Sequence, residues 1–253
     1  MTGADDINLT VLVPEISLAL AAVLGLLLSS WIRRRRQWII RAIAWGSVIV
    51  GTIATVFSML GRNSVTASGS YTIDIPLNAV RIAVLAGTAI VIALGADHFA
   101  GDEREAEFYV LVLLGSLGTI VLAGASDLLL LLAGYLLASI PLYALVGFAR
   151  DRSGTEAMLK YYLMGALFGV FLLFGVLLML ATGGDTVYTE LGKSLPRGPM
   201  SATAVGILGV PAGLLFKAGS VPAPFWVPAA IEGATLPVAA FLPPWPNIAP
   251  PLP

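Results

Sequence analysis

Residues 157–181 read AMLKYYLMGALFGVFLLFGVLLMLA, and this stretch decides the fold class. Lys160, near its start, is its only charged residue. A run of about eighteen or more apolar residues can cross the hydrocarbon of a bilayer only as a helix, because its backbone groups must then be satisfied within the segment. The stretch therefore predicts a membrane-spanning helix.

Further segments along the chain pass the same test of length and apolarity. Together with the first, they predict spans over residues 10–31, 38–60, 78–96, 107–124, 127–149, 157–181 and 201–221. The joint between the fourth and fifth spans is short and only mildly polar. Two helices fit better there than one, because residues 107–149 are too many for a single span even when it is tilted. We therefore expect an all-α, polytopic membrane helix bundle with about seven transmembrane helices.

The composition of the whole chain fits this interpretation. Apolar residues make up 58% of the 253 residues and charged residues only 11%, whereas soluble domains carry roughly a quarter charged residues. The net charge of −1, without a basic stripe interleaved with aromatic residues, gives no sign of a nucleic-acid partner. Cysteine is absent and His98 is the only histidine. This excludes iron–sulfur ligation and multi-histidine metal sites, so we expect any redox cofactors to lie on other chains.

The basic residues predict an orientation in the membrane. One set of alternate loops holds Arg33 to Arg36, Arg104, Arg150 and Arg152, and the other holds Arg62, Lys193 and Arg197. Because short cytoplasmic loops carry an excess of Lys and Arg, we expect the first set in the cytoplasm and the N-terminus outside. The first residues are acidic and lack the positive start of a signal peptide, so we expect the first span to be retained.

Prolines mark the places where helices are expected to break. Pro211 and Pro222 bracket Lys217 in the seventh span, which predicts a broken helix around this lysine. The tail, residues 243–253, contains six prolines in eleven residues and cannot continue a helix.

Ionisable side chains inside a membrane are costly and are therefore functional candidates. Lys217 lies deepest, and a helix break would offer it free carbonyls and the negative end of a half-helix. Because burial disfavours the charged form of a lysine, such a residue could load and release a proton. The alternative is that the break shortens the span and lets Lys217 reach the membrane surface.

The other ionisable groups have simpler interpretations. Lys160 follows Glu156 by four residues, which favours a surface ion pair. Arg41 and Arg81 lie near span ends and are expected to reach the headgroups, and Glu15 is expected at the interface. Asp127 is expected to cap the fifth helix, and Glu232 could face either water or a cavity. The pairs Gly115/Gly118 and Gly165/Gly169 favour close helix packing.

Three segments together carry a resemblance to a known family. They are residues 106–118 (AEFYVLVLLGSLG) with 125–129 (ASDLL), residues 139–146 (SIPLYALV) with 154–166 (GTEAMLKYYLMGA), and Phe216-Lys217 with Ser220-Val221-Pro222, Trp226, Pro228, residues 232–234 (EGA) and 237–242 (PVAAFL). In these segments the chain resembles the N-terminal half of subunit N of the proton-pumping NADH-quinone oxidoreductase, an antiporter-like membrane subunit of respiratory complex I. The Glu-Ala-x-x-Lys-Tyr run favours subunit N over its sister subunits L and M.

The resemblance implies a domain organisation and a role. Residues 1–104 would form three leading transmembrane helices, residues 105–242 an incomplete first antiporter-like five-helix repeat, and residues 243–253 a proline-rich tail. Lys217 matches the family's seventh-helix lysine and Lys160 its sixth-helix lysine, and with Glu232 these are the proton-path candidates. The implied partners are the lipid bilayer and the other complex I membrane subunits, in the plasma membrane of a bacterium. NADH and quinone would act elsewhere in the complex, with no cofactor on this chain.

Departures from the family's pattern keep alternatives open. Leu136 stands where the family has the fifth-helix glutamate, and Asn247 where it has the eighth-helix lysine; the family chain is also about twice as long. We predict a membrane-arm subunit that contributes to proton translocation coupled to quinone reduction, truncated or degenerate, and unable as given to complete a transmembrane proton path. The alternatives are a non-translocating scaffold or decayed copy, and a subunit of a related cation/proton antiporter or membrane hydrogenase.

Overall fold

The computed structural model describes residues 9–31, 37–60, 64–66, 69–221 and 224–242. Within these residues, seven helices are long and apolar enough to cross a membrane, as the sequence predicted. They are α1 (Val13–Trp31), α2 (Trp38–Met59), α3 (Ile75–His98), α4 (Glu105–Gly124), α5 (Leu128–Val146), α6 (Arg152–Gly183) and α8 (Met200–Lys217). The shorter elements are β1 (Ser64–Thr66), β2 (Tyr71–Ile73), α7 (Tyr188–Ser194), η3 (Leu195–Arg197), α9 (Trp226–Gly233) and α10 (Leu236–Phe241).

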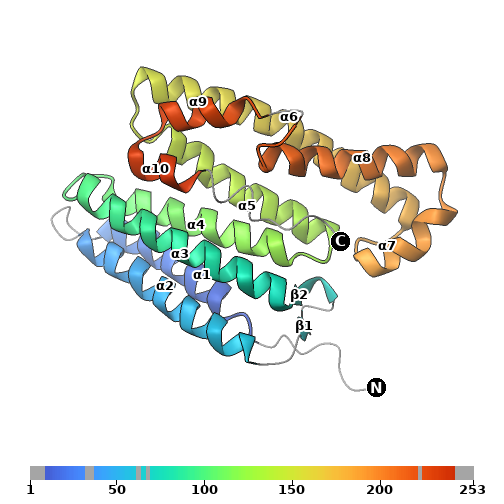
Figure 1. The fold of residues 1–253 in the computed structure, drawn as a ribbon, viewed down its shortest axis with the longest axis horizontal. Coiled ribbons are helices and arrows are strands. Elements are labelled where there is room, and N and C mark those ends of the chain that lie inside the picture. Colours follow the sequence, from blue (N-terminus) through green and yellow to red (C-terminus); the bar gives the residue numbers. More distant parts are fainter. Residues whose placement is uncertain (1–8, 32–36, 61–63, 67–68, 222–223, 243–253) are drawn as a thin grey trace.

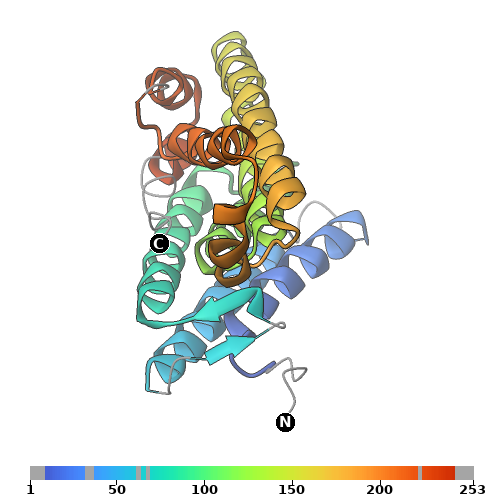
Figure 2. The same ribbon diagram turned by 90° about the vertical axis from the view of Figure 1, so that its right-hand side faces the viewer.

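The long helices run side by side in a bundle, with α4 and α5 between two groups of helices (Figure 1). The helices α1, α2 and α3 lie on one side of this pair, and α6, α8 and α9 lie on the other. The α3–α4 and α5–α6 connections lie at one end of the bundle. The β-hairpin and α7 lie at the opposite end, which faces the viewer in Figure 2.

The ends of the bundle agree in part with the predicted alternation of charged loops. Arg104 precedes α4 and donates to the carbonyl of Phe148, two residues before Arg150 in the α5–α6 connection, so both arginines lie at one end of the molecule, as expected. Arg33 to Arg36 and Arg62 lie outside the described residues, as does the proline-rich tail over residues 243–253.

Glycines allow the central helices to approach each other closely, which confirms the packing role expected for Gly118. A Cβ atom at Gly118 would collide with the backbone of Ala138 on α5. The same device joins α6 and α8, where a Cβ at Gly175 would lie only 2.7 Å from the backbone nitrogen of Val210. In a membrane, such small residues let dispersion forces between helices act over short distances.

The joint between α4 and α5 is a real break between two helices, as expected. Asp127 caps α5, because its Oδ1 accepts hydrogen bonds from the backbone N–H groups of Leu129 (2.8 Å) and Leu130 (3.2 Å). The joint is extended and is held from both sides. Ser126 donates its N–H to Ser70 O next to β2 (2.9 Å), and its own carbonyl accepts from Tyr188 N (3.1 Å).

A buried ion pair joins α1 to α3 at the hairpin end, which corrects the interfacial placement expected for Glu15 and Arg81. Arg81 is fully buried and Glu15 is 8% exposed. Glu15 Oε1 lies 2.6 Å from Arg81 Nη2 and 2.8 Å from Arg81 Nε, and it also accepts from the Tyr71 hydroxyl (2.7 Å). Both side chains stay inside the bundle, because each forms an ion pair with the other there.

The network around this pair is extended by neighbouring groups. Asn78 Oδ1 accepts from Arg81 Nη1 at 3.0 Å. Burial and, next, the Glu15 carboxylate raise the pKa of the Tyr71 hydroxyl well above its usual value, so this hydroxyl stays protonated and donates at neutral pH. The hairpin strand β2, which carries Tyr71, is thereby tied to α1 and α3.

Candidate functional site

Lys217 is a lysine that the structure buries inside the bundle. It is the last residue of α8 and is 5% exposed. Its Nζ donates a hydrogen bond to the hydroxyl of Ser139 on α5, at 2.9 Å, and Ser139 itself is 2% exposed. The contact therefore joins two helices through a lysine amine and a serine hydroxyl that are both shielded from solvent.

The site lies near the middle of the spanning length. Ser139 is the twelfth of the 19 residues of α5, which at about 1.5 Å per residue places it roughly 16 Å from the start of that helix. The shorter helix α8 runs beside only part of α6, so its C-terminal end stops alongside the interior of the bundle (Figure 1). The lysine therefore lies at the depth where an unpaired charge in a bilayer has its highest free-energy cost.

Aromatic rings lie beside the amine and pack around the end of α8. The Lys217 amine lies 5.8 Å from the centre of the Tyr135 ring, on the same helix as Ser139. Trp226 begins α9 and donates its indole N–H to the Phe216 carbonyl at 2.9 Å, which fixes α9 against the end of α8. Tyr161 of α6 stacks on Trp226, with ring centres 4.2 Å apart. The Tyr135 ring offers the amine a weak cation–π attraction, and the stacked rings of Tyr161 and Trp226 pack α6 and α9 together at the end of α8.

The helix break lies after Lys217 and not at Pro211, which corrects part of the expectation. Helix α8 continues through Pro211 and ends at Lys217, and Gly219 then turns the chain with a φ of +63°. Proline removes one helical hydrogen bond, but close packing of α8 on α6 around Gly175 holds the helix together on both sides. Pro222 lies outside the described residues. Lys217 therefore sits at the negative end of the α8 dipole, where a positive charge is favoured.

The structure does not bring the other candidate residues to Lys217. Lys160 is exposed and pairs with Glu156 four residues earlier, at 2.6 Å, so the surface ion pair is confirmed. Glu232 is exposed on α9. Leu136 is 46% exposed on α5, and Asn247 lies outside the described residues. Among the residues that the structure describes, no carboxylate forms an ion pair with Lys217.

Ser139 and Tyr135 are the members of the site that sequence reasoning missed. A signal was present, because the two residues are four apart on one predicted helix and therefore share a face. The family's carboxylate position points instead to Leu136, whose side chain lies on the exposed side of α5.

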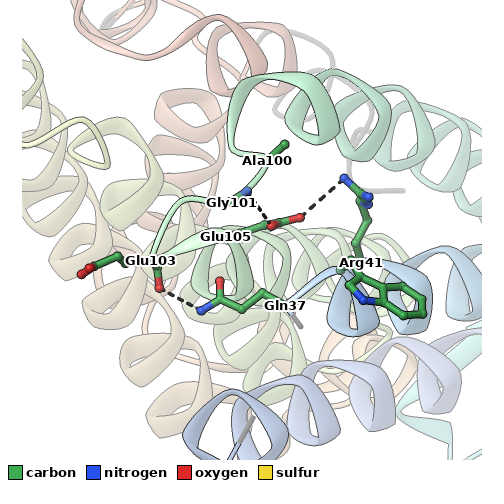
Figure 3. Close-up of a pocket in the computed structure, with 7 residues that line it drawn as sticks. Gln37, Arg41, Ala100, Gly101, Glu103 and Glu105 are labelled. Carbon is green, nitrogen blue, oxygen red and sulfur yellow. Dashed lines mark hydrogen bonds and ion pairs between the residues drawn. The ribbon is translucent and has the colours of Figure 1, made fainter. Parts of the chain in front are cut away.

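A second polar cluster lies at the α3–α4 end of the bundle, in a cavity of about 350 Å³ (Figure 3). Its wall is formed by Gln37, Trp38, Arg41, Ala100, Gly101, Glu103 and Glu105. Arg41, expected only to reach the headgroups, lies 3.6 Å from the buried Glu105 carboxylate, and Gln37 donates to the Glu103 carbonyl at 3.0 Å. These contacts join the starts of α2 and α4, so the cluster fastens helix ends together.

Comparison with curated proteins connects this arrangement to subunit N. The chain is 47% identical to NADH-quinone oxidoreductase subunit N 1 of Streptomyces griseus over 237 residues, which cover 94% of this chain and 50% of the relative. It is 44% identical to NADH-quinone oxidoreductase subunit N of a Mycobacterium species (strain JLS), over 90% of this chain and 49% of the relative. The chain therefore spans about half the length of the curated relatives it matches, and the resemblance to subunit N is confirmed.

Solved structures agree on the fold. A chain of respiratory complex I from Thermus thermophilus, solved with bound aureothin, matches with a TM-score of 0.74 and 28% identity, covering 92% of this chain and 52% of that chain. A chain of the membrane-bound sulfane sulfur reductase, an archaeal respiratory membrane complex, matches with a TM-score of 0.77 at 19% identity, over 91% of this chain and 48% of that chain, which shows the shared fold alone.

The family model described as "NADH:quinone oxidoreductase/Mrp antiporter, TM" matches residues 125–251, half of the chain. This range contains α5, α6 and α8 and therefore both partners of the buried contact, Ser139 and Lys217. The chain belongs to the NADH:quinone oxidoreductase/Mrp antiporter family of membrane proteins.

Proposed function

We propose that this chain is a membrane-arm subunit of an NADH-quinone oxidoreductase in a bacterial plasma membrane, and that Lys217 carries protons in one half-channel. The observation that supports this most directly is the burial of Lys217 in the middle of the bundle, with a hydroxyl as its hydrogen-bond partner. The curated relatives from Streptomyces and Mycobacterium are both called subunit N of that enzyme.

The chemistry follows from the cost of a charge in a dry interior. Among the residues that the structure describes, the end of α8, the Tyr135 ring and one hydroxyl stabilise an ammonium there, so its charged and neutral forms can be closer in free energy than they are in water. Small changes in hydration or in a nearby charge would then move the proton on or off Nζ. This is the property that a proton relay requires of its groups.

The proposed partners follow from the residue types of the chain and from its exposed apolar side chains. Oxidation of NADH and reduction of quinone need redox groups, and a chain without cysteine and with His98 as its only histidine supplies no ligand set for iron–sulfur clusters. Apolar side chains such as Phe171 on α6 and Leu208 on α8 are 47% and 71% exposed, which suits contact with lipid or with other membrane subunits of the complex. We further propose that the N-terminus lies outside the cell.

One observation favours a second candidate, a membrane scaffold that does not translocate protons. Lys217 has no carboxylate partner among the described residues, and both Leu136 and Glu232 are exposed. A lysine that keeps one protonation state could fasten α8 to α5 through Ser139 without taking part in transport.

Replacement of Lys217 separates the two functions. In inverted membrane vesicles from the native cell, we expect Lys217→Ala to lower the number of protons taken up per NADH oxidised, with the complex assembled to its normal level. The matched control is Lys193→Ala, which removes an exposed lysine paired with Glu190 on α7. If the Lys217→Ala complex assembles and keeps the parental proton count, the scaffold function is correct.

A further inference from the structure

We propose that Ser139 is the positioning residue for Lys217: its hydroxyl on α5 holds the amine in place through both protonation states. The proposal rests on the proposed function, because the same lysine would be held in this way during proton transfer. The partner of the lysine is then neutral rather than charged. The lysine can therefore lose its proton without leaving a buried carboxylate unpaired.

The hydrogen-bond geometry makes Ser139 an acceptor toward Lys217. The Ser139 hydroxyl donates its single proton to the Tyr135 carbonyl one turn earlier, at 2.6 Å. Its lone pairs are therefore left for the Lys217 amine, which approaches to 2.9 Å. A serine hydroxyl has one donor and two acceptor sites, so both contacts are satisfied at once.

An acceptor of this kind suits a lysine that changes protonation state. The ammonium has three N–H donors and the neutral amine still has two, so the contact with Ser139 Oγ can persist when the proton leaves. A carboxylate would instead stabilise the ammonium strongly through charge, and loss of the proton would leave that carboxylate buried and unpaired. A neutral hydroxyl positions the amine without binding its proton tightly.

Ser139 is placed on a rigid part of the bundle. The residue before it, Ala138, has its backbone packed directly against Gly118 of α4, so this turn of α5 cannot shift without separating two helices. Leu142, one turn further on, is 1% exposed and is part of the main core. The hydroxyl is therefore fixed relative to the core, and the lysine at the C-terminal end of α8 is held against it.

Other titratable groups on the surrounding elements are arranged differently. They are Tyr135 and Tyr143 on α5, Glu156, Lys160, Tyr161 and Tyr162 on α6, and Glu232 on α9. Tyr135 meets the amine with its ring, the Tyr143 hydroxyl interacts with Ser139, Tyr161 packs against Trp226, and the charged members are exposed. A change at position 139 should therefore act on Lys217 through its hydrogen bond to Nζ, and among these groups Tyr143 is the other one that interacts with Ser139.

The test measures Lys217 itself and needs no turnover. Native membrane vesicles that contain the complex are treated with a small amine-reactive acylating reagent over a range of pH, and modification of Lys217 is followed by mass spectrometry. Lys160 and Lys193 are exposed and provide internal references in the same sample. The variants are Ser139→Ala and Ser139→Thr. The control is Ser116→Ala, because Ser116 is a fully buried serine on α4 that likewise bonds the carbonyl four residues earlier and one side chain, Thr88.

We expect Ser139→Ala to move the pH of half-maximal Lys217 modification downward by about one unit, because the lost hydrogen bond is stronger to the ammonium than to the neutral amine. Ser139→Thr, which keeps the hydroxyl, should retain the parental profile, as should Ser116→Ala. If the alanine variant does not reach the membrane, Ser139→Cys, a weaker acceptor, should shift the profile in the same direction. Coincident profiles for the parent and for the variants without the hydroxyl would overturn the proposal.

Proton counting in the same vesicles keeps the role of Ser139 distinct from the proposed function. If Lys217→Ala leaves pumping unchanged but Ser139→Ala still shifts the modification profile, Ser139 positions a lysine that does not pump. If Lys217→Ala lowers pumping and the profile of Ser139→Ala is unchanged, the lysine works without Ser139. Both proposals hold when both readouts change and Ser139→Thr restores both.

Discussion

At the scale of single residues, the buried pair of Glu15 and Arg81 predicts that removal of one charge lowers the free energy of unfolding strongly. Because Arg81 is fully buried, Arg81→Met would leave the Glu15 carboxylate without its partner, at a cost of about 3–5 kcal/mol in the free energy of unfolding. We expect the double variant Glu15→Leu/Arg81→Met to lose much less than the single variant, since it leaves no buried charge. Denaturant unfolding of the detergent-solubilised chain measures both.

An exposed pair supplies the comparison for that prediction. Lys160 and Glu156 lie close together, but both side chains are largely exposed, so Lys160→Met should leave the unfolding midpoint unchanged within error. Equal losses from Lys160→Met and Arg81→Met would mean that burial does not set the contribution of these pairs.

The sequence alone indicates that Lys217 is a candidate for burial, because this lysine lies far along an apolar segment and between two prolines, and its low exposure confirms the burial. The sequence could not identify the partners of Glu15 or Lys217, since these come from other helices: Arg81 from α3 and Ser139 from α5. Distance along the chain carries no information about which faces of two helices will meet. The headgroup position expected for Arg81 was wrong for that reason.

At the scale of elements, the contact between α6 and α8 depends on glycines that cannot all be replaced. A Cβ at Gly175 would lie 2.7 Å from the Val210 nitrogen on α8, so Gly175→Ala must push the helices apart. We expect a loss of about 1–3 kcal/mol, measured by unfolding in detergent.

A glycine nearer the start of the same helix is the matched control. A Cβ at Gly169 would meet Tyr135 at 3.5 Å, an ordinary contact, so Gly169→Ala should be neutral or slightly stabilising through its better helix propensity. If Gly169→Ala were as harmful as Gly175→Ala, helix contact would not explain either effect.

The elements themselves were largely predictable. All seven spans agree with the prediction, because length and apolarity are properties of the segment alone. The hairpin β1–β2 was not predicted, since its strands are only three residues each and its anchor to the bundle, the Tyr71–Glu15 hydrogen bond, joins residues far apart in the sequence. A break was expected around Pro211 as well as beyond Lys217, whereas packing on α6 keeps α8 continuous through this proline.

At the scale of the whole molecule, the arrangement of charged connections predicts how the chain sits in its membrane. We expect an Arg35→Cys variant to react with an impermeant thiol reagent only from the cytoplasmic side, because its loop belongs to the set rich in arginine. The chain has no native cysteine, so the label has no background. Arg62→Cys, from the opposite set, should react only from outside, and the reverse pattern of labelling would refute the orientation.

The connection between α4 and α5 depends on parts of the chain that are synthesised at different times. Ser126 donates its N–H to the carbonyl of Ser70, earlier in the chain, and its own carbonyl accepts from the N–H of Tyr188, later in the chain. Leu128 donates its N–H to Thr186 O at 2.9 Å. A growing chain delivers Ser70 before this connection but Thr186 and Tyr188 only after α6 has been made. Until then the Ser126 carbonyl and the Leu128 N–H must form hydrogen bonds with water instead. The connection between the fourth and fifth helices is therefore completed only after the sixth helix has been made, so in an unfinished chain its backbone hydrogen bonds are still incomplete.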